Sequence, residues 1–419
     1  MQDSQHHLSA RRERVVLWLL ASLQFTHLLD FMILTPLAPQ FMRQWGITAS
    51  QFGTLVSVYA LAAAVAGLAA SFVIDRFDRK QVLALVYAFF VAATLACALA
   101  PGFWSLLAAR ALAGASGGVV GSLVMAIVGD LIPAERRGRA MGIVMSAFPL
   151  VSVLGVPVSL LLATRLGWHA PFYALGGVSL ALWFCIASVV PRIDSHVRSS
   201  QAAPLGWVAR FTGLFRSATH RRALAAVFLF TLSGFAVFPF LSAYQVKNVG
   251  ISEAELAWVF FAGGLATIFT SRLIGWSADR FGKRRVFVIL ACCSVVPILI
   301  LTHMPRAPLA TLLLVSTLFM VLMSGRFIPL MALVTSCVDP RMRGAFMSLS
   351  SAAQNLAAGV ASLLAGAMIG HAADGSLTGF GAVGICAAGL TLACVLIARK
   401  LAPASGGNAS EQHAATARA

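Results

Sequence analysis

Long apolar runs, separated by short polar and basic segments, dominate the whole chain. Runs of about 20 residues predict helices that cross a membrane, because a helix of that length spans the hydrocarbon core. We predict twelve such spans, of which the tenth is too long for one straight crossing, so its outer end should tilt or project. The predicted ranges are 15–38, 52–74, 81–100, 103–128, 140–163, 169–190, 223–245, 255–278, 286–303, 308–337, 345–370 and 377–398.

The composition agrees with an all-α membrane protein. Of the 419 residues, 59% are hydrophobic and 11% are charged, whereas globular domains carry about 25% charged residues. No soluble domain is long enough to display a nucleic-acid site, so we expect no nucleic-acid partner despite the net charge of +17. None of the seven cysteines lies in a metal-ligand pattern, and we expect no metal.

The basic residues set the predicted orientation. Positive loops stay in the cytoplasm, and most of the 31 Lys and Arg residues fall on one side if both chain ends are cytoplasmic. We therefore predict an N-in, C-in topology, with basic loops that can touch anionic membrane lipids. The few basic residues in the opposite loops are Arg43, Arg165, Lys247 and Arg306.

Two cytoplasmic loops occur twice in the sequence. Asp75-Arg76 after the second span matches Asp279-Arg280 after the eighth, 204 positions later, and the segment around Gly138 recurs around Gly344. The repeat predicts two bundles of six helices. The expected domains are a cytoplasmic N-terminus (1–14), the first bundle (15–190), a cytoplasmic linker with an amphipathic helix (191–222), the second bundle (223–400) and a disordered cytoplasmic tail (401–419).

One carboxylate, Asp30, lies well inside a predicted span. An ionised carboxylate there costs roughly 2.5 to 3.5 kcal/mol, so it should be paired, hydrated or protonated. Burial favours the neutral acid and a nearby cation favours the ionised one, so a change of neighbours could load and release a proton. Arg110 and Arg326 also lie inside spans, and either could be the counter-charge or a substrate anchor, because arginine stays protonated. Alternatively, Asp30 forms a static ion pair that holds helices together.

Two polar residues share the helix face near Asp30. His27, one turn earlier, could relay protons or could be a hydrogen-bonded residue that lines a pore. Gln24 lies within reach of both and is a candidate substrate contact.

Several motifs resemble the major facilitator superfamily between about residues 15 and 400. The loop pattern Gly-x-x-x-Asp-Arg-x-Gly-Arg-Lys is met by Gly275, Asp279, Arg280, Gly282, Lys283 and Arg284, whereas Ser71 and Asp78 replace its glycines in the first copy. Arg110 and Gly114 meet the family's Arg-x-x-x-Gly pattern in span 4. Gly155-Val156-Pro157 resembles the proton-driven drug and sugar efflux branch, which contains predicted arabinose efflux permeases, although Val156 separates a Gly and a Pro that are adjacent in that pattern.

The resemblance implies the fold of that family and its rocker-switch alternating access. Spans 1, 4, 7 and 10 would line a central cavity, and Gln24, Asp30, Arg110 and Arg326 would lie around it. Gly155 and Pro157 would form a functional helix kink. The doubled loops would form a cytoplasmic gate, unless they are only a topology signal; its residues would be Asp75, Arg76, Asp279, Arg280, Gly282 and Arg284.

We therefore expect a monomeric transporter of a bacterial inner membrane that exports a small organic molecule, such as a drug, sugar or metabolite, in exchange for protons. Its energy source would be the proton gradient, with no cofactor. A proton symporter, a facilitator and a substrate-sensing receptor are the alternatives. We do not expect an enzyme: Gly114-Ala-Ser116-Gly-Gly118 matches the Gly-x-Ser-x-Gly motif but lies inside a membrane helix instead of a strand-to-helix elbow.

Overall fold

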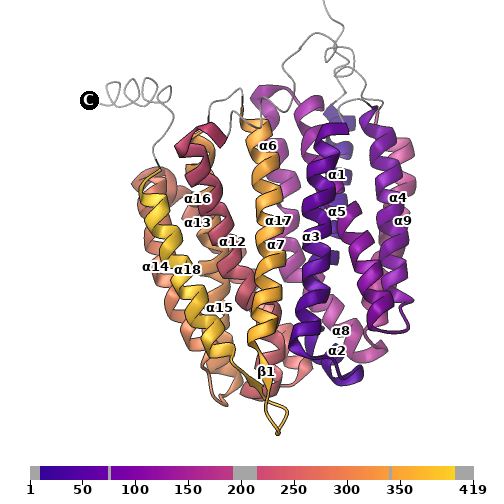
Figure 1. Cartoon of the computed structure of the whole chain (residues 1–419). Helices are drawn as coiled ribbons and strands as arrows, with labels where there is room; N and C mark the ends of the chain where they lie inside the picture. The colour runs from indigo at the N-terminus through magenta and orange to yellow at the C-terminus, as the bar shows by residue number, and fades with distance from the viewer. Residues whose placement is uncertain (1–9, 74–76, 192–214, 339–341, 402–419) are drawn as a thin grey trace, which may run out of the picture.

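A computed structural model describes residues 10–73, 77–191, 215–338 and 342–401 as an upright bundle of helices (Figure 1). The C-terminal end of the last helix, α18 (Phe380–Arg399), and the small β-hairpin lie at opposite ends of this bundle. Four of the expected features fall outside the described residues: most of the cytoplasmic N-terminus, the Asp75-Arg76 loop, the amphipathic linker helix and the C-terminal tail.

The first half of the chain contains six spans, some of them divided. The element bounds are α1 Ala10–Met32, α2 Ala38–Gln44, α3 Ala49–Val73, α4 Arg79–Ala98, α5 Phe103–Leu131, α6 Ala134–Met145, α7 Ala147–Leu150, the π-helix η2 Val151–Gly155, α8 Val156–Leu166 and α9 His169–Val189.

The second half repeats this arrangement and adds the hairpin. Its bounds are α12 Ala218–Tyr244, the π-helix η3 Gln245–Val249, α13 Glu253–Phe281, α14 Lys283–Thr302, α15 Leu309–Gly325, α16 Phe327–Ser336, α17 Arg343–Met368, β1 Gly370–His371, β2 Leu377–Thr378 and α18 Phe380–Arg399. The two strands are antiparallel, with Gly370 opposite Thr378.

The observed helices agree with the twelve-helix architecture. Eleven described segments are long and apolar enough to cross a membrane, and α17, with 26 residues, completes the set. The largest differences from the predicted boundaries lie in the first, fifth, tenth and last spans. The first helix ends at Met32, short of the predicted 38, and the fifth span is divided into α6, α7, η2 and α8. The first helix already begins at Ala10, the last begins at Phe380 because residues 377 and 378 form a strand, and the long tenth run is divided at Arg326. Pro329, which has no N–H group, lies just beyond that division.

The hydrophobic core is shared between the halves at only one end. At the end that carries the hairpin, one cluster contains side chains from both halves, including Phe52 and Phe240. Toward the cytoplasmic end the first half has its own core, which contains Val16 and Val124, and the second half has another, which contains Val227. The halves are therefore closed at the extracellular end and separate toward the cytoplasm, which is an inward-facing arrangement.

Helices α3 and α17 form much of the extracellular contact between the halves. A Cβ atom on Gly53 would lie 2.5 Å from the carbonyl oxygen of Ser362, so these helices cross with their backbones in contact. Ser57 Oγ donates a 2.7 Å hydrogen bond to the carbonyl oxygen of Gly359. Small residues allow such close crossings.

An ion pair also joins the halves at this end. The Arg43 guanidinium, near the end of α2, donates to the carboxylate of Glu253 at the start of α13. Arg43 and Glu253 are 210 positions apart in the sequence, and no sequence pattern predicts this pair.

Candidate functional site

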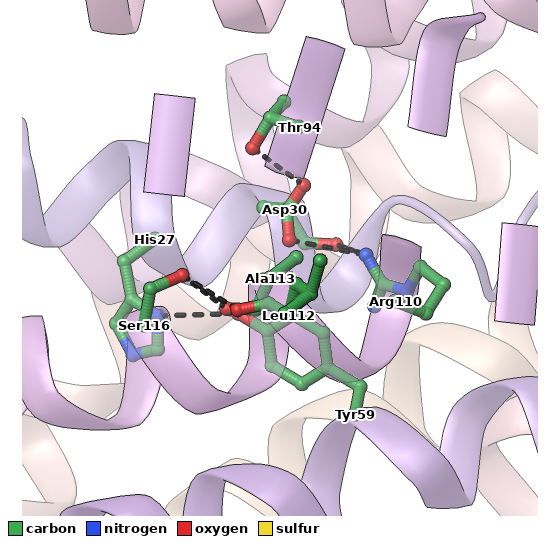
Figure 2. A network of polar contacts seen from close by, with 8 residues as sticks. All are labelled: His27, Asp30, Tyr59, Thr94, Arg110, Leu112, Ala113 and Ser116. Atoms are coloured by element: carbon green, nitrogen blue, oxygen red, sulfur yellow. Dashed lines mark hydrogen bonds and ion pairs between the residues drawn. The ribbon is translucent and has the colours of Figure 1, made fainter. Parts of the chain in front are cut away.

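Asp30 forms a buried ion pair with Arg110 inside the first half (Figure 2). Arg110 Nη1 donates to Asp30 Oδ2 at 3.0 Å and to the Asp30 backbone carbonyl at 2.9 Å. Thr94 Oγ1 donates to the other carboxylate oxygen at 3.4 Å. Both charged residues have no exposed surface. The carboxylate thus joins α1, α5 and α4, and of the two candidate arginines it is Arg110 that pairs with it.

Glycines on α5 bring this helix against α3. A Cβ atom on Gly114 would lie 2.2 Å from the carbonyl oxygen of Tyr59, and one on Gly118 would lie 2.6 Å from that of Ala63. The close crossing places the Tyr59 ring beside the guanidinium, with Arg110 Cζ 4.2 Å from the ring centroid. A desolvated cation–π contact of this kind contributes about 2 kcal/mol. The aromatic ring therefore helps to hold the buried arginine.

His27 extends the site by one turn of α1 toward the cytoplasmic end. Its Nδ1 lies 3.3 Å from the hydroxyl oxygen of Tyr59, as Figure 2 shows. Gly117 makes this approach possible, because a Cβ atom there would lie 2.6 Å from the Tyr59 hydroxyl and 2.8 Å from His27 Nδ1. The His27 side chain is partly exposed. Contacts therefore run from a partly exposed imidazole through Tyr59 to the guanidinium that holds Asp30.

Two residues of this network, Tyr59 and Thr94, were absent from the predicted site. Each is a polar residue within a largely apolar span, and no motif or spacing marks it. Gln24, which was predicted, is 7% exposed on α1 and its Oε1 has no hydrogen-bond partner among the described residues.

Arg326 lies apart from this network, in the second half. Its Nη1 donates to Ser294 Oγ and to Thr391 Oγ1, both at 3.0 Å, and its Nη2 donates to Ser233 Oγ at 3.4 Å. Phe230 covers one face, with its ring centroid 5.1 Å from Arg326 Cζ. No described carboxylate pairs with this arginine, which is 1% exposed. Hydroxyls of α12, α14 and α18 therefore take the place of a counter-ion.

The second copy of the cytoplasmic loop forms the turn between α13 and α14. Gly282 adopts φ +94°, a conformation that side chains disfavour. Arg280 lies over the ring of Trp276 at 5.2 Å, and Arg284 donates to the carbonyl oxygen of Leu401. Asp279 is exposed and forms no ion pair with another described residue. A gate at this loop therefore stays a prediction.

The fifth span is irregular beside Gly155 and Pro157. The π-helical turn η2 ends at Gly155, and α8 begins at Val156. A Cβ atom on Gly155 would lie 2.9 Å from Leu29 Cδ1, so this glycine lets the fifth span pack closely on α1. A functional role for the irregular turn stays a prediction.

The N-terminal half has further ion pairs near the cytoplasm that were not predicted. Arg79 Nε lies 3.1 Å from Asp130 Oδ2 and joins α4 to α5. Arg136 lies 3.0 Å from Glu13 and joins α6 to α1. Both pairs lie within one half, so they stiffen that half without holding the cytoplasmic side shut.

Comparisons with known proteins agree with this architecture. A family model described as "Major Facilitator Superfamily" matches residues 20–248 and 223–418. The MFS-type transporter YceJ of Bacillus subtilis (strain 168) is 27% identical over 368 residues, which cover 88% of this chain and 93% of YceJ. A crystal structure of a D-xylose-proton symporter superposes with a TM-score of 0.75 at 16% identity, covering 94% of this chain and 98% of that one. The nucleoside transporter NupG gives 0.71 at 15% identity, with 93% and 99% covered.

Proposed function

Because this chain belongs to the Major Facilitator Superfamily and is a multi-pass transporter of the cell membrane, we propose that it exports a small organic molecule in exchange for protons. The two halves would rock about a site near the membrane midplane and open it to one side at a time. The observation that carries the proposal is the buried Asp30–Arg110 pair, because it is an ionisable group that a conformational change can uncover.

The pair supports proton coupling through its charge balance. Burial favours the neutral acid, whereas donation from Arg110 and Thr94 favours the carboxylate, so a small change around the pair would shift the proton. Opening the extracellular end would move α1 relative to α5, weaken the pair, and let Asp30 take up a proton from outside. After return to the inward-facing arrangement, binding of the next substrate molecule would favour the ionised pair and release the proton to the cytoplasm.

His27 and Tyr59 would provide the cytoplasmic exit for this proton. The imidazole is partly exposed and contacts the Tyr59 hydroxyl, and hydrogen-bonded side chains of this kind pass protons. One charge crossing 100 mV yields about 2.3 kcal/mol. At about 1.4 kcal/mol per decade, this sustains a roughly fortyfold substrate gradient for each proton.

The test is substrate-induced proton release from purified protein in a weakly buffered solution. A panel of candidate substrates is added to wild type and to Asp30→Asn, and the pH change is recorded. Asp374→Asn is the matched control, because that carboxylate lies in the extracellular loop and bonds only to Ser376 among the described residues. We expect release from wild type and the control, and none from Asp30→Asn.

Two outcomes would contradict the proposal. Equal proton release from Asp30→Asn would mean that Asp30 does not carry the proton and only forms a static ion pair with Arg110. Proton uptake in place of release would indicate a symporter, in which proton and substrate bind together. Vesicle transport against imposed pH gradients of either direction would then establish which way the substrate moves.

A further inference from the structure

The two halves meet at a pair of equivalent phenylalanines. Phe31 and Phe235 are 204 positions apart, which is the offset of the doubled cytoplasmic loop. Their ring centroids lie 5.5 Å apart, one on α1 and the other on α12. Phe31 also contacts Tyr59 at 5.2 Å, and Phe235 contacts Phe238 at 6.5 Å. These rings close the extracellular side of the gap near the symmetry axis, where transporters built from repeats bind their substrates.

On the cytoplasmic side of this ring pair, α1 presents polar groups. Gln24 and His27 precede Phe31 by seven and four residues, so the three side chains share a face of α1. Phe31 contacts Phe235 of the other half, and His27 packs against Tyr59 and α5 of its own half, so this face borders both halves. Gln24 differs from the other two residues. Its exposed fraction is only 7%, and its Oε1 has no hydrogen-bond partner among the described residues. A buried amide oxygen without a donor is costly, so this acceptor is suited to a ligand's donor.

The equivalent face of α12 is apolar. Residues 204 positions after Gln24 and His27 are Phe228 and Thr231. The Thr231 hydroxyl donates to the carbonyl oxygen of Val227 at 3.0 Å, so its donor is already used within its own helix. Unlike α1, this wall offers a ring and methyl groups.

An apolar hollow of about 430 Å³ continues this wall between α12 and α17. Ligand pockets typically have volumes of about 300 to 1,000 Å³. Phe228 lines this hollow and is also the residue of α12 that corresponds to Gln24 by the 204-residue offset, which links the two features through the repeat. The lining residues are Phe215, Leu224, Ala225, Phe228, Leu229, Leu349 and Ala353.

The charged side chains inside the membrane have partners away from this face. Asp30 and Arg110 neutralise each other inside the first half. Arg326 is held by Ser233, which lies two residues from Phe235 and hence on nearly the opposite side of α12. Among the described residues, this face therefore offers neither a carboxylate to a cation nor an arginine to an anion.

We propose that the substrate is an uncharged amphipathic molecule that binds between α1 and α12. A hydroxyl or amide N–H group would donate to Gln24 Oε1, the apolar body would lie against Phe228 and enter the hollow, and the Phe31–Phe235 pair would form the extracellular wall. The inference rests on the proposed transport function and narrows its substrate class.

A matched series of ligands with one apolar body tests the proposal. The probes are 4-phenylbutanamide, its N,N-dimethyl analogue without a donor, 4-phenylbutyrate as the anion and 4-phenylbutylammonium as the cation, with D-xylose as a polar probe. Binding to protein in nanodiscs is measured by ligand-observed NMR, and empty nanodiscs correct for partition into lipid. We expect the primary amide to bind at least about fivefold more tightly than every other probe, which is the worth of one buried hydrogen bond.

Two variants test the polar wall at Gln24 and the apolar wall at Phe228 separately, and a third is the control. Gln24→Leu should reduce amide affinity to that of the dimethyl analogue, whereas Phe228→Ala should weaken both about tenfold through lost ring contact. Phe184→Ala, on the 63% exposed side chain of α9, is the control and should change neither affinity. If Phe228→Ala lowers the thermal unfolding midpoint, Phe228→Leu preserves the apolar volume and should retain the preference for the primary amide.

The outcomes also separate this inference from the proposed function. Tighter binding of a charged probe or of D-xylose, equal binding of the dimethyl analogue, or no amide binding above empty nanodiscs would overturn the substrate class. Proton release induced by one of those other probes would leave proton coupling intact. Conversely, amide binding that depends on Gln24 and Phe228 but releases no proton would support the site and contradict the antiport.

Discussion

Removing the ion pair between Arg43 and Glu253 should shift the transporter toward its extracellularly open state. The pair connects α2 of the first half with α13 of the second, at the end where the halves are closed. Rocking to the outward-facing state separates these elements, so the pair stabilises only the inward-facing state. A contact present in one of two states biases the equilibrium between them by its own free energy.

The expected size of the shift follows from the exposure of the two side chains. Arg43 is 67% exposed and Glu253 is 15% exposed, and pairs with an exposed partner contribute about 0.2–1 kcal/mol. At about 1.4 kcal/mol per decade, Glu253→Gln should increase the ratio of outward-facing to inward-facing molecules by roughly 1.4-fold to fivefold. High salt should reproduce part of this effect by screening the pair.

Spin labels at Thr164 and Ala373, one at the extracellular side of each half, would report the two populations by double electron–electron resonance. The exposed native cysteines are first replaced by serine. Glu255→Gln is the matched control, because it also removes a carboxylate from the first turn of α13 but contacts Ser252 in place of the other half. The exchange of charges in Arg43→Glu with Glu253→Arg should restore the wild-type distribution. An unchanged distribution in Glu253→Gln, or an equal shift in Glu255→Gln, would refute the reasoning.

Four further predictions concern stability. Gly114→Ala should cost about 1–3 kcal/mol, because its Cβ would overlap the Tyr59 carbonyl, and Gly282→Ala should cost a similar amount at φ +94°. Gly275→Ala, which has open space for a Cβ, should leave the thermal unfolding midpoint in detergent unchanged or raise it slightly. Burial, followed by the Lys247 charge, lowers the pKa of His371 in the extracellular hairpin. A lowered pKa means that the stabilisation is complete above about pH 6.5 and is lost as the pH falls. The protection of the hairpin amides, measured as the ratio of intrinsic to observed exchange rate, should therefore fall between pH 8 and 5.5, and His371→Gln should abolish that fall.

The fold was predictable because its governing constraint is simple. Long apolar runs, basic loops and the doubled loop at Asp75 and Asp279 each depend on short sequence segments, and the membrane permits few arrangements of such segments. The divided tenth span was harder. Pro329 marks an interruption, but sequence alone does not determine whether the helix tilts, projects or divides, since neighbouring helices decide which of these occurs.

The candidate site was predictable only in part. The depth of a residue in the membrane can be counted along its helix, whereas the direction in which its side chain points depends on how the helices pack. Asp30 and Arg110 were recognisable as buried charges. The contact of Tyr59 with Arg110 depends on the close α3–α5 crossing, which a glycine pattern suggests without specifying the partner. The Arg43–Glu253 pair depends on how the two halves meet, and no local signal carries that information.

Arg110 and Arg326 are both buried inside the membrane, but their partners differ, so we expect them to have different roles in transport. The residue 204 positions after Asp30 is Gly234, so the second half has no carboxylate at the corresponding position. A Cβ atom at Gly234 would lie 3.1 Å from Met323 Cε, which leaves little space for a longer side chain. Arg326 donates to hydroxyl groups instead. Unlike a carboxylate, a hydroxyl group does not change its charge when a proton becomes available. If Asp30 carries the proton, the chemistry of coupling is therefore confined to the first half, and the second half contributes its apolar wall.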